Sequence, residues 1–170
     1  MKLAIFDIDN CLAQSHWREQ YIKGDSKGTI NWDNFHQLSG LDEVSPITQK
    51  KYAELLIDGY RVVFSTSRPA KWRLLTHHWL RRKLDIADHP AIYMRDDDDM
   101  RQAEKVKNAS LCRIYEYYAT LKTDTVIAFD DHPEVITMYR NNDIEAFHWD
   151  VNGLIASSLQ PQLAGLHKYD

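Results

Sequence analysis

The chain has 170 residues, of which 44% are hydrophobic and 27% charged, and its formal net charge is −4 at pH 7. This length suits a single domain, residues 1–170, with a proper hydrophobic core. The acidic balance argues against a broad basic surface for duplex nucleic acid, but recognition of a strand end needs only a few local cations.

The cysteines and the hydrophobic runs predict the compartment. Cys11 and Cys112 form neither a disulfide framework nor a paired metal motif, which fits a reducing cytoplasm. We see no signal peptide after Met1, and no apolar run approaches the ~20 residues of a membrane span. We therefore expect a cytoplasmic protein with no membrane segment.

The first predicted strand ends in a pair of carboxylates. Residues 2–6 form an apolar run typical of a buried parallel strand, and Asp7 and Asp9 follow it. In an extended chain these two side chains point the same way, where like charges repel. A bound cation, or a division of labour between a nucleophile and a proton carrier, would explain the pair. A solvated strand end is the competing interpretation.

Residues 10–44 are polar and aromatic, and we expect an irregular stretch there, with residues 12–44 as a small cap-like insertion. Residues 24–28 are predicted to form its loop tip. Trp17, Tyr21, Trp32 and Phe35 are expected to pack it onto the body. One or two of them could instead line a substrate cleft, since an insertion after the first strand lies over the carboxyl end of that strand.

The rest of the chain alternates helices and strands. Ser45 and Pro46 are predicted to begin a helix that Gly59 ends, with an apolar face formed by Tyr52, Leu55 and Leu56. Strands are predicted at residues 60–66, 91–94, 125–129 and 144–149, and helices from residue 69 and at 103–121 and 133–141, before a tail on the surface. In the helix from residue 69, Trp72 and Trp79 are expected in the core. This order indicates a doubly wound α/β fold with a parallel sheet covered on both faces.

Polar residues fall where several predicted strands end. Ligands of such sheets bind beyond the carboxyl ends of the strands. The residues expected at this rim are Asp7, Asp9, Thr66, Asp130 and Asp131, with Lys107 in reach from the start of a helix. Carboxylates gathered at one rim favour Mg²⁺, and a lysine with a hydroxyl suits phosphoryl oxygens. An aspartate can also accept a phosphoryl group as a nucleophile.

The same residues carry a family resemblance. The order Asp7-x-Asp9, Thr66, Lys107 and Asp130-Asp131 resembles the haloacid dehalogenase-like phosphohydrolases. A narrower string resembles the 3′-phosphatase domain of polynucleotide kinase and its phage and bacterial relatives, over residues 2–149. That string consists of Trp32-Asp33-x-Phe35, Thr66-Ser67-Arg68-Pro69, Met94-Arg95, Asp99-x-Arg101 and Lys107.

The resemblance implies a role for each matching residue. Asp7 would be the nucleophile and Asp9 the general acid and then base, while Thr66 and Lys107 would hold the phosphate. The implied Mg²⁺ ligands are Asp7, the backbone carbonyl of Asp9, and Asp130 or Asp131. The implied substrate-binding residues are Ser67, Arg68, Arg95 and Arg101, although the arginines could equally hold the acidic loop or form surface ion pairs.

Three departures accompany the resemblance. Asn10-Cys11 replaces the usual Gly-Thr of the family, and Asn is the next best residue after Gly at positive φ, so the loop is expected to form. Ser67 stands where the kinase relatives often have Gly, and His132 where an Arg can follow the aspartate pair. None of these changes removes a group that does the chemistry.

The function that we expect is a Mg²⁺-dependent phosphomonoesterase that removes the 3′-phosphate from a phosphorylated nucleic acid end or nucleotide. A 5′-nucleotidase or general small-molecule phosphatase is the alternative on the same chemistry. A non-catalytic phosphate-binding or interaction module is the alternative from another class. No G-x-x-x-x-G-K-[ST] sequence occurs, so the sequence holds no kinase P-loop.

Overall fold

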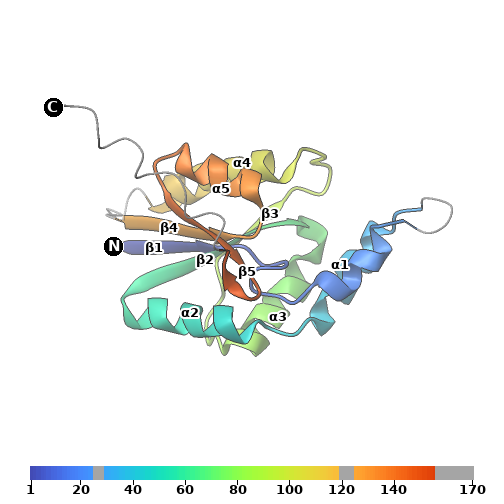
Figure 1. Ribbon diagram of the computed structural model, residues 1–170, viewed down its shortest axis with the longest axis horizontal. Helices are drawn as coiled ribbons and strands as arrows, with labels where there is room; N and C mark the ends of the chain where they lie inside the picture. The colour runs from blue at the N-terminus through green and yellow to red at the C-terminus, as the bar shows by residue number, and fades with distance from the viewer. Residues whose placement is uncertain (25–28, 119–124, 156–170) are drawn as a thin grey trace.

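The computed structural model describes residues 1–24, 29–118 and 125–155, which form a six-stranded sheet between two layers of helices (Figure 1). The strands are β1 (Lys2–Phe6), β2 (Tyr60–Pro69), β3 (Ile92–Arg95), β4 (Thr125–Asp130), β5 (Glu145–Asp150) and β6 (Gly153–Leu154). Their order is β3-β2-β1-β4-β5-β6, with parallel pairing as far as β5 and antiparallel pairing between β5 and β6. The predicted doubly wound parallel sheet is confirmed.

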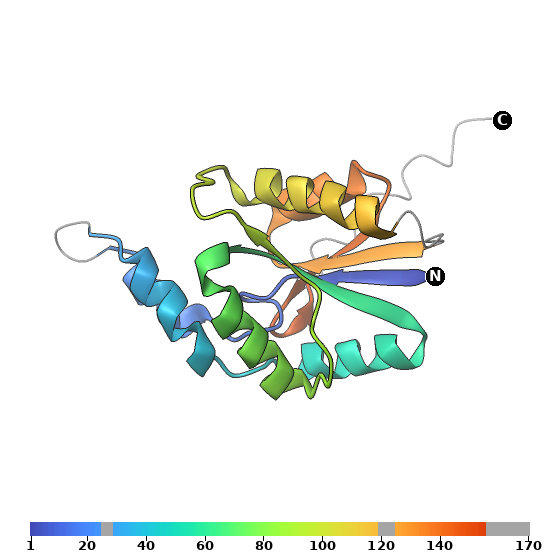
Figure 2. The ribbon, with the colours of Figure 1, turned by 180° about the vertical axis from the view of Figure 1, so that it is seen from behind.

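Four helices cover the sheet. The helices α2 (Pro46–Ile57) and α3 (Arg73–Leu84) lie on one face, and α4 (Ala103–Tyr118) and α5 (Pro133–Arg140) lie on the other (Figure 2). Along β1, Ala4 and Phe6 pack toward the first pair of helices, while Leu3 and Ile5 pack toward the second. Both faces of β1 are buried, which is why its sequence is a continuous apolar run. Within the described ranges, no helix is long and apolar enough to cross a membrane.

The helix ends predicted around α2 are confirmed. The Ser45 hydroxyl accepts a hydrogen bond from the Thr48 N–H at 3.2 Å, Pro46 occupies the first turn, and Gly59 ends the helix at a φ of +79°. The predicted apolar face is partly wrong, because Leu56 is 47% exposed while Tyr52 is buried. Leu56 lies on the side of the helix that faces solvent, away from the sheet.

The helix predicted to begin at Pro69 begins later. Strand β2 continues to Pro69, whose ψ of 146° is extended, and a short 3-10 helix, η3 (Ala70–Trp72), precedes α3. Pro69 has no N–H to donate and pairs with Arg95 beyond an irregularity in the β2–β3 ladder. Trp79 is buried in the core as expected, whereas Trp72 is only half-buried.

The prediction that the insertion is irregular is wrong. It contains two 3-10 helices, η1 (His16–Tyr21) and η2 (Leu38–Leu41), and the short helix α1 (Trp32–Gln37), which the Asn31 side chain caps at 2.9 Å. Phe35 is buried, but Trp17 and Trp32 are 42% and 53% exposed and so are not core anchors. Most of the predicted loop tip, the end of the helix predicted to 121 and the tail from 156 lie outside the described residues.

Candidate active site

The carboxyl ends of β1 and β4 place three carboxylates together. The strands pair in parallel with Phe6 opposite Phe129, and the Asp7 N–H donates to the Phe129 carbonyl at 2.9 Å. One carboxylate oxygen from each of Asp7, Asp130 and Asp131 lies within 4.8 Å of the other two. Two chain segments more than 120 residues apart thus form one cluster, which we call the acidic cluster.

Lys107 on α4 is the cation of this cluster. Its Nζ lies 2.6 Å from Asp7 Oδ1 and 2.5 Å from Asp130 Oδ2, and all three side chains are buried. Burial alone would lower the pKa of Lys107, but the charges of Asp130 and Asp7 raise it well above its ordinary value. Burial raises the pKa of Asp7, and Lys107 opposes that rise. The lysine therefore stays charged beside Asp7.

The acidic cluster has the donor set for a hard divalent cation. Three carboxyl groups share one lysine there, and burial and the neighbouring Asp130 charge raise the pKa of Asp131 to about 6, as expected where acids are crowded together. All three offer oxygen atoms, which Mg²⁺ prefers over the nitrogen and sulfur ligands that suit transition metals. The residues present therefore fit Mg²⁺.

Asp9 lies in a different electrostatic environment, between two buried arginines. Arg68 donates from Nε to Oδ2 and from Nη2 to Oδ1, both at 2.8 Å, and Arg18 donates from Nη2 to Oδ1 at 2.5 Å. Burial would raise the pKa of Asp9, but the charges and hydrogen bonds of Arg68 and Arg18 hold it well below its usual range. The two carboxylates that follow β1 thus differ: Lys107 contacts the first and the arginines hold the second.

Arg18 and Asp42 form a buried pair that sequence reasoning missed. Arg18 Nε and Nη2 donate to Asp42 Oδ1 and Oδ2 at 2.8 and 2.7 Å, and neither side chain has exposed surface. The Arg18 guanidinium also lies 4.3 Å from the centre of the Phe35 ring. Both partners belong to the insertion, so this pair connects the insertion to Asp9. No spacing pattern in the sequence links the two positions.

Two hydroxyl side chains, Thr66 and Ser67, lie near the carboxyl end of β2. Thr66 is buried, and its Oγ1 accepts the Arg68 N–H at 3.3 Å. The Ser67 hydroxyl is also buried, and it has no hydrogen-bond partner in the described structure. Buried polar atoms without a partner are uncommon, so Ser67 retains a free donor close to Arg68.

Arg95 and Arg101 have other partners. Arg95 donates to the carbonyls of Ser67, Asp99 and Arg101 at 2.9, 2.7 and 2.6 Å. Arg101 donates two hydrogen bonds to the Asp99 carboxylate, from Nε at 2.9 Å and from Nη2 at 2.7 Å. In this structure both arginines therefore hold the acidic loop after β3, one of the alternatives that the sequence left open.

The loop after Asp9 forms despite the departure from Gly-Thr. Asn10 has a φ of +57°, and its N–H donates to the Ala13 carbonyl at 2.9 Å and to Ser15 Oγ at 3.0 Å. The positive φ expected of Asn10 is confirmed. Cys11 is buried beside the acidic cluster, and burial raises the pKa of its thiol well above the ordinary value. The thiol therefore stays protonated.

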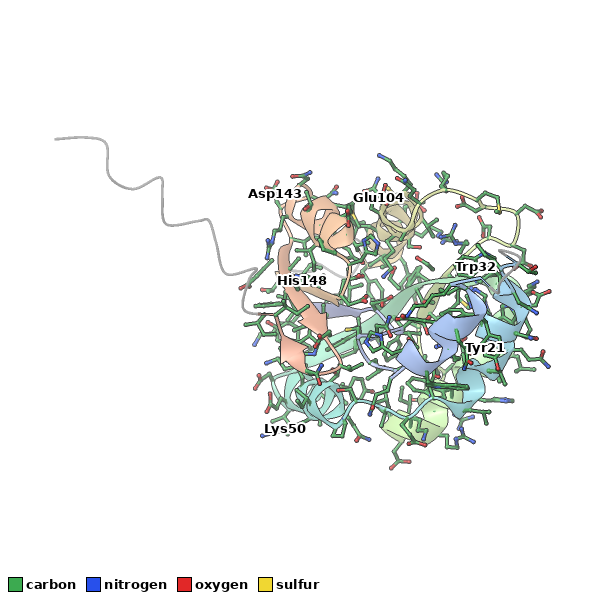
Figure 3. The ribbon with its side chains drawn as sticks, turned by 45° about the vertical axis from the view of Figure 1, so that its right-hand side comes forward. Tyr21, Trp32, Lys50, Glu104, Asp143 and His148 are labelled. Atoms are coloured by element: carbon green, nitrogen blue, oxygen red, sulfur yellow. The ribbon has the colours of Figure 1, made fainter. Side chains whose placement is uncertain are left out.

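Figure 3 turns the molecule toward the carboxyl ends of the strands. Trp32, on α1 of the insertion, and Glu104, at the start of α4, both lie on the side of the molecule seen in this view. A doubly wound sheet with an acidic cluster and a buried lysine at this edge defines a phosphatase of the haloacid dehalogenase-like class.

The family model described as the polynucleotide kinase PNKP phosphatase domain matches residues 1–152. The chain belongs to this family. The match covers every strand from β1 to β5 and all residues of the site described above. No curated protein sequence matches the chain.

Solved structures share the fold at low sequence identity. Two structures of the Pnkp1/Rnl/Hen1 complex, one of them titled an RNA repair complex, match with TM-scores of 0.64 and 0.62 and identities of 21% and 19%. They cover 87% and 86% of this chain but only 45% and 41% of theirs, so the chain spans less than half of those proteins. A hydrolase from Streptococcus pneumoniae TIGR4 matches at a TM-score of 0.57 and 12% identity, covering 86% of this chain and 91% of that one.

Proposed function

We propose that this phosphatase is a Mg²⁺-dependent phosphomonoesterase that forms an aspartyl phosphate on Asp7 and removes 3′-phosphates from nucleic acid ends or nucleotides. The observation that carries the proposal is the buried Asp7 carboxylate, with Lys107 Nζ at 2.6 Å and Asp130 and Asp131 beside it. A buried carboxylate next to a fixed cation is suited to attack a phosphorus atom.

Two half-reactions follow from this arrangement. In the first, Asp7 forms a bond to phosphorus, the ester P–O bond breaks, and Asp9 gives a proton to the leaving oxygen. In the second, Asp9 takes a proton from water, whose oxygen attacks phosphorus and releases Asp7. Lys107 neutralises negative charge on Asp7 and on the phosphoryl oxygens throughout both steps.

A metal ion would be held by Asp7, the Asp9 carbonyl and Asp130 or Asp131, and when bound it supplies positive charge to the phosphoryl oxygens. Thr66 and Ser67 are proposed to donate hydroxyl hydrogen bonds to those oxygens, and the free Ser67 donor supports that role. Arg68 and Arg18 orient the Asp9 carboxylate. Asp9 is ionised at rest, and the charge of an arriving phosphate favours its protonation, because like charges raise a carboxyl pKa.

The 3′-phosphate preference rests on the family and on the string from Trp32 to Lys107. The family is that of a polynucleotide kinase phosphatase domain, and one similar structure is that of an RNA repair complex. A 5′-nucleotidase or general small-molecule phosphatase would use the same groups. The complete acidic cluster and Lys107 favour an enzyme over a non-catalytic module. The free thiols of Cys11 and Cys112 support our proposal of a cytoplasmic location.

Phosphate release from four substrates tests this proposal: a 3′-phosphorylated oligonucleotide, its 5′-phosphorylated counterpart, and 3′- and 5′-mononucleotides. We expect the highest kcat/KM for a 3′-phosphate, with Asp7→Asn as the inactive control. A clear preference for a 5′-mononucleotide would overturn the substrate assignment and leave the phosphatase chemistry in place.

A further inference from the structure

The cations around the site have little capacity left for a second phosphate. The arginines concerned already bind carboxylates or backbone carbonyls: Arg18, Arg68, Arg95 and Arg101. Lys71, on η3, is 2.7 Å from Asp33. The loop at residues 96–99 adds four aspartates near this rim. Since these cations of the described residues are already paired, we expect the group beyond the reacting phosphate to be bound mainly by contacts that are not ionic.

Trp32 is an exposed aromatic side chain on a fixed support. It begins α1, and 53% of its surface is exposed. Its neighbour Asp33 binds Lys71 Nζ at 2.7 Å, which ties α1 to the segment directly after β2. The Asn31 cap at 2.9 Å fixes the first turn of the helix. Since the backbone under Trp32 is held from two directions, its ring can be a preorganised surface.

Two further aromatic rings contact Trp32. The His36 ring, one turn along the helix, lies 6.0 Å away and within 20° of parallel. Phe35 meets Trp32 edge-on at 5.8 Å, and its own ring lies under Arg18, which is bonded to Asp9. Contacts therefore run without a break from Asp9 through Arg18 and Phe35 to Trp32, so the exposed indole lies two side chains away from Asp9.

We propose that Trp32 stacks on the base of the nucleotide whose phosphate occupies the site at Asp7. The proposal rests on the proposed function and names the group that distinguishes a nucleotide from other phosphates. A base is flat, largely uncharged and sequence-tolerant as a stacking partner, which suits a rim short of free cations. Trp17, the other exposed tryptophan of the insertion, is tied down, because its Nε1 donates to Asp42 at 2.9 Å.

Matched pairs of substrates test the proposal. Kinetics are measured for wild type, Trp32→Ala and Trp32→Phe, with Tyr117→Ala as the exposed-aromatic control from the far end of α4. One pair is a short 3′-phosphorylated oligonucleotide with a normal or an abasic terminal residue. The other pair is a 5′-mononucleotide and ribose 5-phosphate. In each pair, we expect Trp32→Ala to lower kcat/KM about 10-fold for the substrate that has the base and to leave the substrate without the base unaffected. Trp32→Phe should keep most of the wild-type kcat/KM.

The two pairs separate failure of this proposal from failure of the proposed function. Inactivity of wild type on both 3′-phosphorylated oligonucleotides, with a Trp32 effect confined to the mononucleotide, would overturn the 3′-end assignment and support the role of Trp32. An equal loss on both members of a pair that is turned over would show that Trp32 is only structural. The proposal would also be overturned if wild type had the same kcat/KM for the two members of a pair, with and without the base. A loss of the same size in Tyr117→Ala would likewise count against it.

Discussion

Replacing Arg18 with methionine should destabilise the protein strongly, although the residue lies in an insertion. Arg18 and Asp42 have no exposed side-chain surface, and their two hydrogen bonds measure 2.7 and 2.8 Å. Without Arg18 the buried Asp42 keeps the Trp17 N–H at 2.9 Å and the more distant Arg68 guanidinium at 3.6 Å, and removing one partner of a buried pair costs about 3–5 kcal/mol. For a chain of this size, that loss corresponds to a fall in Tm of about 10 °C.

A second variant separates the cost of an orphaned charge from the value of the pair. In Arg18→Met/Asp42→Leu no charge is left unpaired, and Arg68 still holds Asp9 through two bonds of 2.8 Å. Apolar replacement of a buried pair is often neutral, so the remaining loss comes mainly from two groups that lose a partner, the Phe35 carbonyl and the Trp17 indole N–H. We expect the double variant to lie about 1–3 kcal/mol below wild type, above Arg18→Met alone.

Urea unfolding at neutral pH measures these differences as shifts of the midpoint at a constant slope. Arg101→Met is the control, because the Arg101–Asp99 pair is exposed on the arginine side and such pairs are worth about 0–1 kcal/mol. The reasoning is refuted if Arg18→Met falls within 1 kcal/mol of wild type, an interval taken from that exposed-pair range. It is also refuted if the double variant loses as much free energy of unfolding as Arg18→Met and Asp42→Leu lose in total when each is made alone.

Three further outcomes are expected. Asp7→Asn should abolish phosphate release and any trapped phosphoryl enzyme, whereas Asp9→Asn should slow release but still bind a phosphate mimic; wild-type turnover in either variant would contradict the assigned roles. Exhaustive chelation should remove phosphatase activity, and added Mg²⁺ should restore it; full activity in chelator would rule out the metal. Burial lowers the pKa of His36 from 6.5 to about 4. As the pH falls from 6.5 to 4, His36 is therefore protonated in the unfolded chain but not in the folded one, and the folded state loses stability. The stability of wild type relative to His36→Phe should therefore fall by about 3 kcal/mol between pH 7 and pH 4 in urea unfolding, and a constant difference would contradict the shift.

The sheet and the acidic cluster were predictable because their signals are local. A short apolar run followed by Asp7 or by Asp130 marks a buried strand and its carboxyl end, and parallel topology then brings such ends together. The lysine needed only a helix start in reach of the same edge. For the aspartates, the rule that parallel strands end at the same edge of a sheet shows that residues far apart in sequence are neighbours in space.

The environment of Asp9 was not predictable in the same way. Arg18 and Asp42 lie 24 positions apart in a segment with no clear period, and only the packing of η1 and η2 against α1 brings them together. A buried arginine in a polar stretch looks like a surface residue, because charged side chains are almost never fully buried unless they are paired. Pairing depends on the tertiary contacts, which the composition of the segment does not reveal.

The bond between Arg18 and Asp9 also limits how this enzyme can diversify. An insertion that only covered a site could be exchanged or shortened to suit a new substrate, with the chemistry left intact. Here Arg18 of the insertion binds Asp9, for which we propose the role of proton carrier, so we expect changes at Arg18 or Asp42 to affect the reaction. Ile30 and Trp32 are exposed, and a change at either leaves the bonds to Asp9 in place, so we expect substrate range to change at such positions.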